Sequence, residues 1–388
     1  MRRRRGLRER GAGDRMSAEQ IEIQIIASLV AITCAIPGVF LVLRRMAMMS
    51  DAISHAILLG IVLAFFAVGD ISSPILIIGA ALSGVLTVSL VELLNRTKLV
   101  KEDASIGLVF PLLFSIGVIL ISKYAYNIHL DVHAVLLGEI AFAPFDRLVI
   151  SGSDLGPKSM YVMGGILLLN LVFILLLYKE LKVATFDAGL AAALGFTPGL
   201  LHYGLMGIVS VTAVGAFDAV GSILVVALMI APPAAAYLLT DRLPRMIILS
   251  ALIGILSAIC GFWAAILLDA NIAGSMASVS GLIFLVVFLL APERGLAAIA
   301  RRKTRQKREF AGRMLAIHLL NHEGTPEEAR ESEVGHIEET LRWKEGFAKS
   351  VVGYSVKRGN VLVENGRLRL TEKGREFAGR SVVEEFIV

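Results

Sequence analysis

The chain has little cysteine, little charge and no P-loop for nucleotides. Its two cysteines, Cys34 and Cys260, lie inside apolar stretches and form no Cys-x-x-Cys pair, so a structural zinc site of that type is not indicated. No Gly-x-x-x-x-Gly-Lys-Ser/Thr stretch occurs, and the chain therefore cannot hold ATP phosphates in the P-loop manner. Charged residues make up 18% of the sequence, against about 25% in an average soluble domain, which argues against a soluble protein.

Long apolar blocks fill most of the sequence instead. Hydrophobic residues make up 56% of the chain, and the mean hydropathy is +0.74. A helix needs about 20 such residues to cross a membrane, so we expect an all-α polytopic membrane protein with eight or nine transmembrane helices. Gly215, Asp218 and Gly221 interrupt one region, where a re-entrant piece would fit as well as two spans. The nine candidate blocks are residues 21–43, 53–69, 71–94, 106–122, 160–178, 200–217, 219–239, 246–268 and 276–291.

The basic residues indicate how these blocks cross the membrane. Positively charged loops stay in the cytoplasm, and Arg and Lys collect in alternate loops and again from Arg294 onward. This places the C-terminus in the cytoplasm and, with nine spans, the N-terminus outside. The arginine-rich head, residues 1–19, contradicts that arrangement. We interpret the head as foreign to the natural product, with Met16 as the start; the alternatives are a block that does not span, or an arm on anionic lipid.

Asp51 and His55 are the most informative residues of the apolar region. They stand four positions apart, so one face of a helix would carry both, just before the apolar run 57–68. Ionisable groups at membrane depth are costly unless an ion or a partner compensates them. A carboxylate and an imidazole suit a divalent transition metal, and we predict that this pair binds an ion in transit. The alternative is a helix-packing histidine that is bonded to Asp51.

A second group of candidate ligands lies in a loop that we place outside the cytoplasm. His129 and His133 are also four apart, with Asp131 between them, and Glu139 follows. These residues could receive a metal ion from an extracytoplasmic metal-binding protein, although we favour a role in shaping its docking surface. Asp218, between two apolar runs, is equally a pathway carboxylate or a loop cap.

The chain changes character after the last apolar block. Residues 296–309 are rich in Arg and Lys, which predicts a basic juxtamembrane linker that could contact anionic membrane lipid. Residues 310–388 predict a small soluble domain, in which two short strands flank a tight Asn-Gly turn. Thr371 then caps a last helix. Helices before a two-stranded wing and a final helix are typical of an α+β winged-helix-like cytoplasmic domain.

The end of this domain, Leu370 to Ala378, resembles the Leu-Thr-x-x-Gly-x-x-x-Ala ending of winged-helix regulators, such as iron- or manganese-dependent repressors. From Glu309 to Val388 there are 12 basic and 14 acidic residues, whereas a DNA-binding domain normally shows a basic footprint. We therefore favour an interaction or regulatory module over nucleic-acid binding. Three histidines could form a metal-sensing site with nearby Glu323 and Glu333, or be plain surface residues: His318, His322 and His336.

Five stretches resemble, in the expected order, the membrane subunits of metal-type ABC importers, which import manganese, zinc or iron. The resemblance covers roughly residues 20–295 and implies a permease domain in a bacterial inner (plasma) membrane. It implies ABC ATPase subunits, an extracytoplasmic metal-binding protein and a second permease, identical or different, as partners. The chain is then no enzyme, binds no permanent cofactor and carries Mn²⁺, Fe²⁺ or Zn²⁺. The five stretches are Arg44–Ala64, Lys101–Ala104, Val135–Ile140, Asp187–Gly195 and Val220–Ala236.

The resemblance also gives roles to particular positions. It places a metal-pathway pair at Asp51 and His55, with His133, Glu139 and Asp218 as further candidates. The sequence around Glu139 is closer to the manganese and iron branch than to the zinc branch. The resemblance implies that the connector of residues 178–195 lies on the ATPase at the cytoplasmic side, where its small residues would let the partner surface approach closely. A plain amphipathic connector is the alternative. The expected ATPase-coupling residues are Phe186, Asp187, Ala188, Ala191, Leu194 and Gly195.

Two other functions are compatible with the sequence. A permease for larger metal chelates, such as siderophores, needs a wide apolar route and does not need Asp51 and His55. A membrane-tethered regulator would use residues 310–388 to bind DNA, with the membrane helices serving chiefly as an anchor or a sensor.

Overall fold

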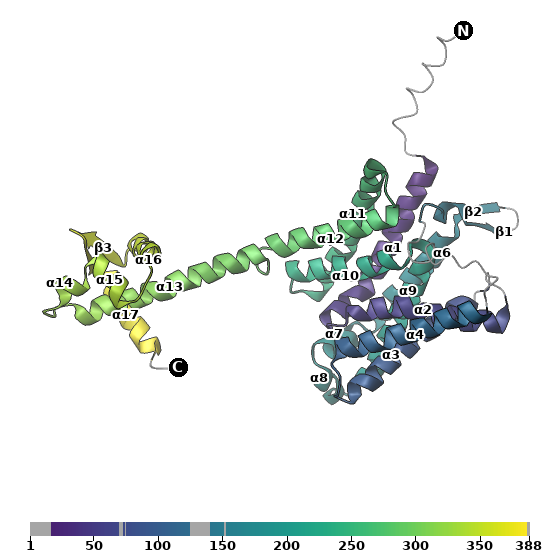
Figure 1. The fold of residues 1–388 in the computed structure, drawn as a ribbon, viewed down its shortest axis with the longest axis horizontal. Coiled ribbons are helices and arrows are strands. Elements are labelled where there is room, and N and C mark those ends of the chain that lie inside the picture. Colours follow the sequence, from purple (N-terminus) through teal and green to yellow (C-terminus); the bar gives the residue numbers. More distant parts are fainter. Residues whose placement is uncertain (1–16, 70–72, 74, 125–139, 151–152, 386–388) are drawn as a thin grey trace, which may run out of the picture. The chain divides into compact units, whose positions relative to one another are not determined.

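Nine helices of the described residues are long and apolar enough to cross a membrane (Figure 1). The prediction of an all-α polytopic membrane protein is confirmed, and each of the nine apolar blocks contributes one helix. In the computed structural model the described residues are 17–385 without 70–72, 74, 125–139 and 151–152. The nine helices are α1 (Ala18–Leu43), α2 (Met48–Val68), α3 (Ile75–Arg96), α4 (Glu102–Tyr124), α6 (Lys158–Leu176), α9 (Pro198–Val220), α10 (Ser222–Leu239), α11 (Leu243–Leu268) and α12 (Ile272–Leu290).

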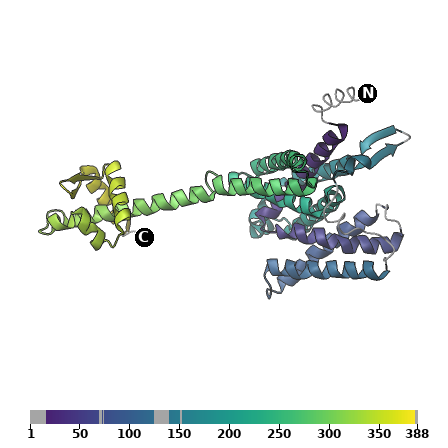
Figure 2. The same cartoon turned by 45° about the horizontal axis from the view of Figure 1, so that its top comes forward.

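The chain divides into two compact units, Met1–Ala291 and Pro292–Val388. In the first unit, α1 packs against α10 and α11, while α2 packs against α3 and α4, as both Figure 1 and Figure 2 show. Small residues allow this close packing, as is common between membrane helices. A Cβ atom on Gly60 of α2 would clash with the carbonyl of Gly79 on α3, so these two helices meet backbone to backbone.

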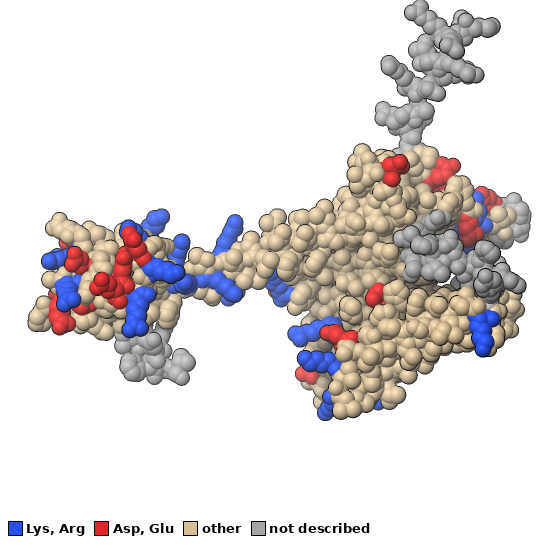
Figure 3. All heavy atoms as spheres, viewed as in Figure 1, with Lys and Arg blue, Asp and Glu red and all other residues tan. Residues whose placement is uncertain are grey.

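The outer surface of the first unit is apolar. On the face shown in Figure 3, most of the helical surface carries no charged side chain. Large apolar side chains are exposed along α4, α6 and α11, which suits contact with lipid acyl chains rather than water. Examples are Leu108, Leu112, Ile119, Leu168, Leu175, Ile248 and Leu252.

A hairpin between α4 and α6 was not expected from the sequence. Strands β1 (Arg147–Ile150) and β2 (Ser153–Pro157) pair antiparallel after the short 3-10 helix η1 (Ala143–Phe145). The side chain of Arg147 anchors the hairpin, because it forms ion pairs with Asp154 and with Glu22 near the start of α1. These strands are too short for periodicity to reveal them.

The second unit consists of helices and a strand hairpin. The strands pair antiparallel, and the turn residues Asn365 and Gly366 both have positive φ (50° and 78°), as a type I′ turn requires. The hydroxyl of Thr371 accepts a hydrogen bond from the Gly374 N–H at 3.0 Å, which confirms the expected cap. The elements are α13 (Leu296–His322), α14 (Glu328–Glu331), α15 (Val334–Thr340), α16 (Glu345–Lys357), β3 (Val361–Glu364), β4 (Arg367–Leu370) and α17 (Glu372–Glu385).

Helix α13 contains the basic run after the last membrane helix. Residues 296–309, predicted as a basic juxtamembrane linker, form the first half of this helix, and its second half contributes Leu315 and Leu319 to the core of the unit. Arg, Lys, Gln and Ala favour helix even where no apolar stripe is present, so the basic run continues the helical conformation.

Candidate metal pair and coupling segment

Asp51 and His55 lie at the N-terminal end of α2. The helix begins at Met48, so Asp51 is in the first turn, where the helix dipole stabilises a carboxylate. His55 follows one turn later, and its Nε2 lies 3.4 Å from Oδ1 of Asp51. The side chains are 31% exposed for His55 and 33% for Asp51, so both remain accessible within this single chain. The structure thus brings the predicted pair together on one accessible face.

Two aromatic rings of α4 hold the imidazole of His55. Phe110 stacks on it at 5.7 Å between ring centroids with an interplanar angle of 27°, and Phe114 meets it edge-on at 6.0 Å. Such packing fixes the orientation of the ring and surrounds it with apolar surface. This contact could not be predicted from the sequence, because it depends on how α2 and α4 pack.

The neighbouring serines are not available as ligands. Ser50 donates its hydroxyl hydrogen to the Ala47 carbonyl at 2.9 Å, and Ser54 donates to the Ser50 carbonyl at 2.9 Å. Both side chains are buried, which agrees with a packing role. The pair alone therefore offers one carboxylate and one imidazole, and further ligands for an ion have to come from elsewhere.

The remaining predicted ligands are not joined to this pair by any contact that the described residues show. Asp218 is exposed in the last turn of α9, before Gly221, whose φ of +80° marks the break between α9 and α10. His133 and Glu139, with His129 and Asp131, lie outside the described residues.

The predicted coupling residues form a short helical connector between α6 and α9. Helix α7 (Tyr178–Phe186) is followed by Asp187, whose carboxylate accepts a hydrogen bond from the Leu190 N–H at 2.9 Å and so caps α8 (Ala188–Ala193). Gly195, with a φ of +86°, ends the connector in a conformation that favours glycine.

The surface of this connector is apolar at several positions. Phe186, Leu190 and Leu194 are each at least half exposed, and Ala188 is exposed beside them. Ala191, in contrast, is fully buried and packs inside the chain. Exposed apolar side chains gathered on one short connector are typical of a protein interface.

Arg44, the residue after α1, links this connector to the α1–α2 connection. Its Nε donates to Oγ1 of Thr185 on α7 at 3.2 Å, and its Nη1 lies 3.4 Å from Nδ1 of His202 on α9. On α3, Glu92 forms an ion pair with Arg96 at 2.6 Å and lies 4.0 Å from Nε2 of His202. The sequence analysis assigned no role to Arg44 itself, so its part in joining these segments was missed.

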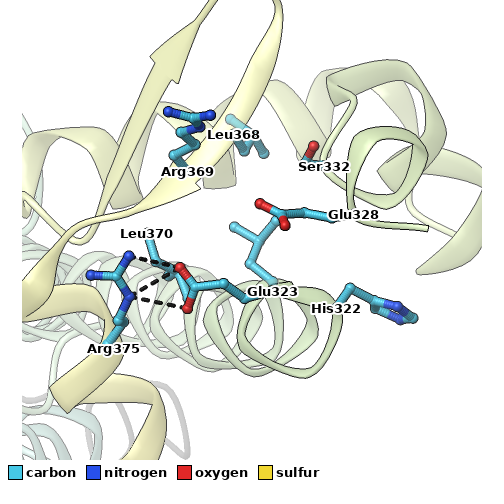
Figure 4. Close-up of a pocket in the computed structure, with 9 residues that line it drawn as sticks. His322, Glu323, Glu328, Ser332, Leu368, Arg369, Leu370 and Arg375 are labelled. Atoms are coloured by element: carbon cyan, nitrogen blue, oxygen red, sulfur yellow. Dashed lines mark hydrogen bonds and ion pairs between the residues drawn. The ribbon is translucent and has the colours of Figure 1, made fainter. Parts of the chain in front are cut away.

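A pocket of about 140 Å³ opens in the second unit, beside the end of α13 (Figure 4). Glu323 points to Arg375, and the two form hydrogen bonds of 2.7 to 3.0 Å that hold the pKa of Glu323 below its ordinary value. The ring of His322 points away from that pair. Glu323 is thus engaged with an arginine rather than with the histidines.

Comparison of the sequence with known protein families shows to which family the chain belongs. The model of the ABC 3 transport family matches residues 19–291. The chain belongs to the ABC 3 transport family. It is therefore a membrane permease subunit of an ABC transporter, without the ATPase that drives it.

Relatives in the ABC 3 family differ in how much of the chain they match. The zinc transport system membrane protein TroD of Treponema pallidum is 45% identical over 92% of this chain and 97% of its own length. The manganese transport system membrane protein MntD of Bacillus subtilis is 49% identical over 75% of this chain, yet 99% of its own length. A C-terminal extension of this size is thus absent from some family members.

Solved structures agree with the fold. The chain is similar to PsaBC from Streptococcus pneumoniae, solved in complex with Fab, with a TM-score of 0.59 and 29% identity over 72% of this chain and 94% of that one. An inward-facing putative metal-chelate type ABC transporter matches with a TM-score of 0.50 at 20% identity, over 69% of this chain and 84% of that one, a likeness of fold alone.

Proposed function

We propose that this ABC 3 permease carries a divalent transition-metal ion through the membrane, Mn²⁺ or Fe²⁺ in preference and Zn²⁺ as a further candidate. The observation that carries the proposal is the Asp51–His55 pair, an ionisable pair on a membrane-spanning helix that is accessible on one side. The oxygen atoms of a carboxylate and the nitrogen atoms of an imidazole are suitable ligands for these ions. Relatives named for manganese, zinc and chelated iron transport support the same class of ion.

A second permease, identical or different, would complete the site. Two ligands leave most of the coordination of a transition metal open, and a subunit interface on the accessible face of α2 would supply the same residues again. Few protein ligands also suit transport, because the ion has to leave as readily as it arrives. We place the complex in a bacterial inner membrane, with the C-terminus in the cytoplasm.

The connector of α7 and α8 would receive the movement of the ATPase subunits. We assign its exposed side chains Phe186, Ala188 and Leu194 to contact with the ATPase. Asp187 and Gly195 would shape the connector, and the buried Ala191 would pack beneath it. Closure of the ATPases would then rock the two permeases and expose the ion to alternate sides. An extracytoplasmic metal-binding protein would deliver the ion at the opposite face, to the loop of His133 and Glu139.

Uptake of radioactive Mn²⁺, Fe²⁺ and Zn²⁺ by the reconstituted complex tests the proposal. Asp51→Asn and His55→Gln keep the size of each side chain but weaken or remove its metal ligand, and each should lower uptake at least about tenfold. Ser54→Ala on the same helix is the control and should retain uptake. Asp218→Asn distinguishes a pathway carboxylate, which would lose uptake, from a loop cap, which would not. Unchanged uptake in both pair variants would favour a permease for larger chelates.

For the second unit we propose a winged-helix-like module of residues 310–388 that acts through protein contacts or regulation. The hairpin with its type I′ turn and the helix that Thr371 caps support this assignment. The net charge of −2 from Glu309 to Val388 disfavours DNA binding. A gel-shift experiment with the full chain in detergent and duplex DNA at low salt tests the alternative, and a salt-dependent shift would establish a membrane-tethered regulator.

A further inference from the structure

Two histidines lie side by side at the end of α13. His318 and His322 are one helical turn apart, and their ring centroids are 4.8 Å from each other with an interplanar angle of 55°. Side chains four positions apart share a helix face, so both imidazoles are directed to the same side of α13. Neither ring belongs to the permease unit, because α13 is part of the second compact unit.

Glu331, the last residue of α14, completes the group. Its Oε2 lies 3.4 Å from Nε2 of His318, and its Oε1 lies 3.1 Å from Nε2 of His336. The carboxylate is only 15% exposed, and its Oε2 is buried without a hydrogen-bond partner. A buried carboxylate oxygen that accepts no hydrogen bond is costly, and a cation is one way to compensate it.

The spacing of these groups suits one metal ion. One ligand atom from each of His318, His322 and Glu331 lies within 4.8 Å of the others. In a tetrahedral site with bonds of 2.0 to 2.2 Å, neighbouring ligand atoms are about 3.4 Å apart, so small side-chain rotations close the site. Two imidazoles and a carboxylate are a ligand set for Zn²⁺ and for Fe²⁺ or Mn²⁺ with open positions.

The backbone around the group is held in place. Gly324 turns the chain between α13 and α14 with a φ of +77°, and its N–H donates to the carboxylate of Glu328 at 2.8 Å. Glu323, the residue after α13, is bound to Arg375 of α17. Ligand residues on elements that such contacts hold in place lose less conformational entropy when an ion binds.

We propose that His318, His322 and Glu331 form a second metal-binding site, which takes a divalent first-row transition ion. His336 holds the carboxylate of Glu331 in position through its hydrogen bond, as groups behind metal ligands commonly do. An ion at this site joins the end of α13 to α14. Its use as a sensor of the transported ion rests on the function proposed above, whereas binding itself does not.

Equilibrium dialysis of the full chain in detergent against Zn²⁺ and against Mn²⁺ tests the site. His318→Gln combined with His322→Gln, and Glu331→Gln alone, should each lower the bound ions by one per chain or weaken that binding at least about tenfold. Glu327→Gln, at the residue before α14, is the matched control and should bind as the unaltered chain does, because its side chain is exposed and makes no capping hydrogen bond. Equal binding by all of these variants would overturn the proposal.

Amide hydrogen exchange of the unaltered chain provides a second measurement, which does not depend on whether a variant folds. With Zn²⁺ present, amide hydrogen exchange should slow in residues 318–336, and an intact chain without that protection would contradict the site. A chain with Asp51→Asn and His55→Gln separates the two proposals. Its exchange protection in 318–336 should persist even if the pathway pair fails to bind metal.

Discussion

Nε of Arg44 lies 3.2 Å from Oγ1 of Thr185, and this contact joins the start of the α1–α2 connection to helix α7. Arg44 is seven residues before Asp51, the first residue of the metal pair, while Thr185 is two residues before Asp187, which caps α8. The hydrogen bond therefore lies on a short path between the proposed ATPase contact and the proposed metal pair. Nη1 of Arg44 also faces His202, so α9 is tied to the same point.

Arg44→Gln should uncouple ATP hydrolysis from transport. A hydrogen bond to a charged group contributes about 1.5 to 3 kcal/mol, so its loss should free α7 from Arg44 and lower the number of ions carried per ATP. Thr185→Val removes the same contact from the other side and should act in the same direction. The measurement is uptake and ATP hydrolysis in the same proteoliposomes.

Arg45→Gln is the control for that comparison. Arg45 is the adjacent arginine, is exposed and leaves the contact with Thr185 intact. If Arg44→Gln and Arg45→Gln give the same ratio of ions to ATP, the contact transmits no movement.

Gly60→Val should prevent α2 and α3 from meeting. A Cβ atom at this position clashes with the Gly79 carbonyl, and backbone cannot move aside as a flexible side chain can. Forced overpacking costs about 1 to 3 kcal/mol or more, so the purified permease should lose thermal stability and uptake together. Gly165→Val on α6 has open space around its Cβ position and serves as the control. Equal stability of the two variants would contradict the close approach.

The sequence predicted the membrane helices well because each needs only a long apolar block. Asp51 and His55 were predicted as neighbours because four-residue spacing on one helix determines their distance. Phe110 and Phe114 were missed, since they reach His55 only through the packing of α2 against α4. Contacts between distant segments have no periodic signal in the sequence.

The same limit explains the second unit. The Asn-Gly turn and the cap at Thr371 follow from local backbone preferences, and both were predicted correctly. The sequence suggested Glu323 and Glu333 as partners of the histidines, yet Glu331 is the carboxylate beside them. Which of several nearby acids turns inward depends on how α14 folds back on α13, and spacing along the chain does not reveal that.

Glu323→Gln should remove a pH-dependent part of the stability of the second unit. Arg375 lowers the pKa of Glu323, so the pair stabilises the folded state above the ordinary pKa of 4.5 and loses that effect as pH falls through the lowered value. Because both side chains are partly exposed, the effect is at most about 1 kcal/mol.

Fluorescence of Trp343 during unfolding measures this effect, in a chain where Trp263→Phe removes the tryptophan of the first unit. The variant should be less stable than the unaltered glutamate at neutral pH and equal to it in acid. Arg375→Met should show the same pattern. A stability difference that persists unchanged below the lowered pKa would point to packing rather than to the ion pair.

Asn170→Leu should weaken the joint between α1, α6 and α9. The buried amide of Asn170 donates to the Thr33 carbonyl at 3.1 Å and to Oγ1 of Thr212 at 2.9 Å, and each lies on a different helix. Hydrogen bonds between membrane helices contribute about 0.6 kcal/mol on average and up to about 1.7 kcal/mol, so a modest fall in thermal stability is expected. Combining Asn170→Leu with Thr212→Val measures the interaction between the two side chains. The double variant should lose less thermal stability than the two single variants lose in sum. A loss equal to that sum would show that the two side chains do not stabilise each other.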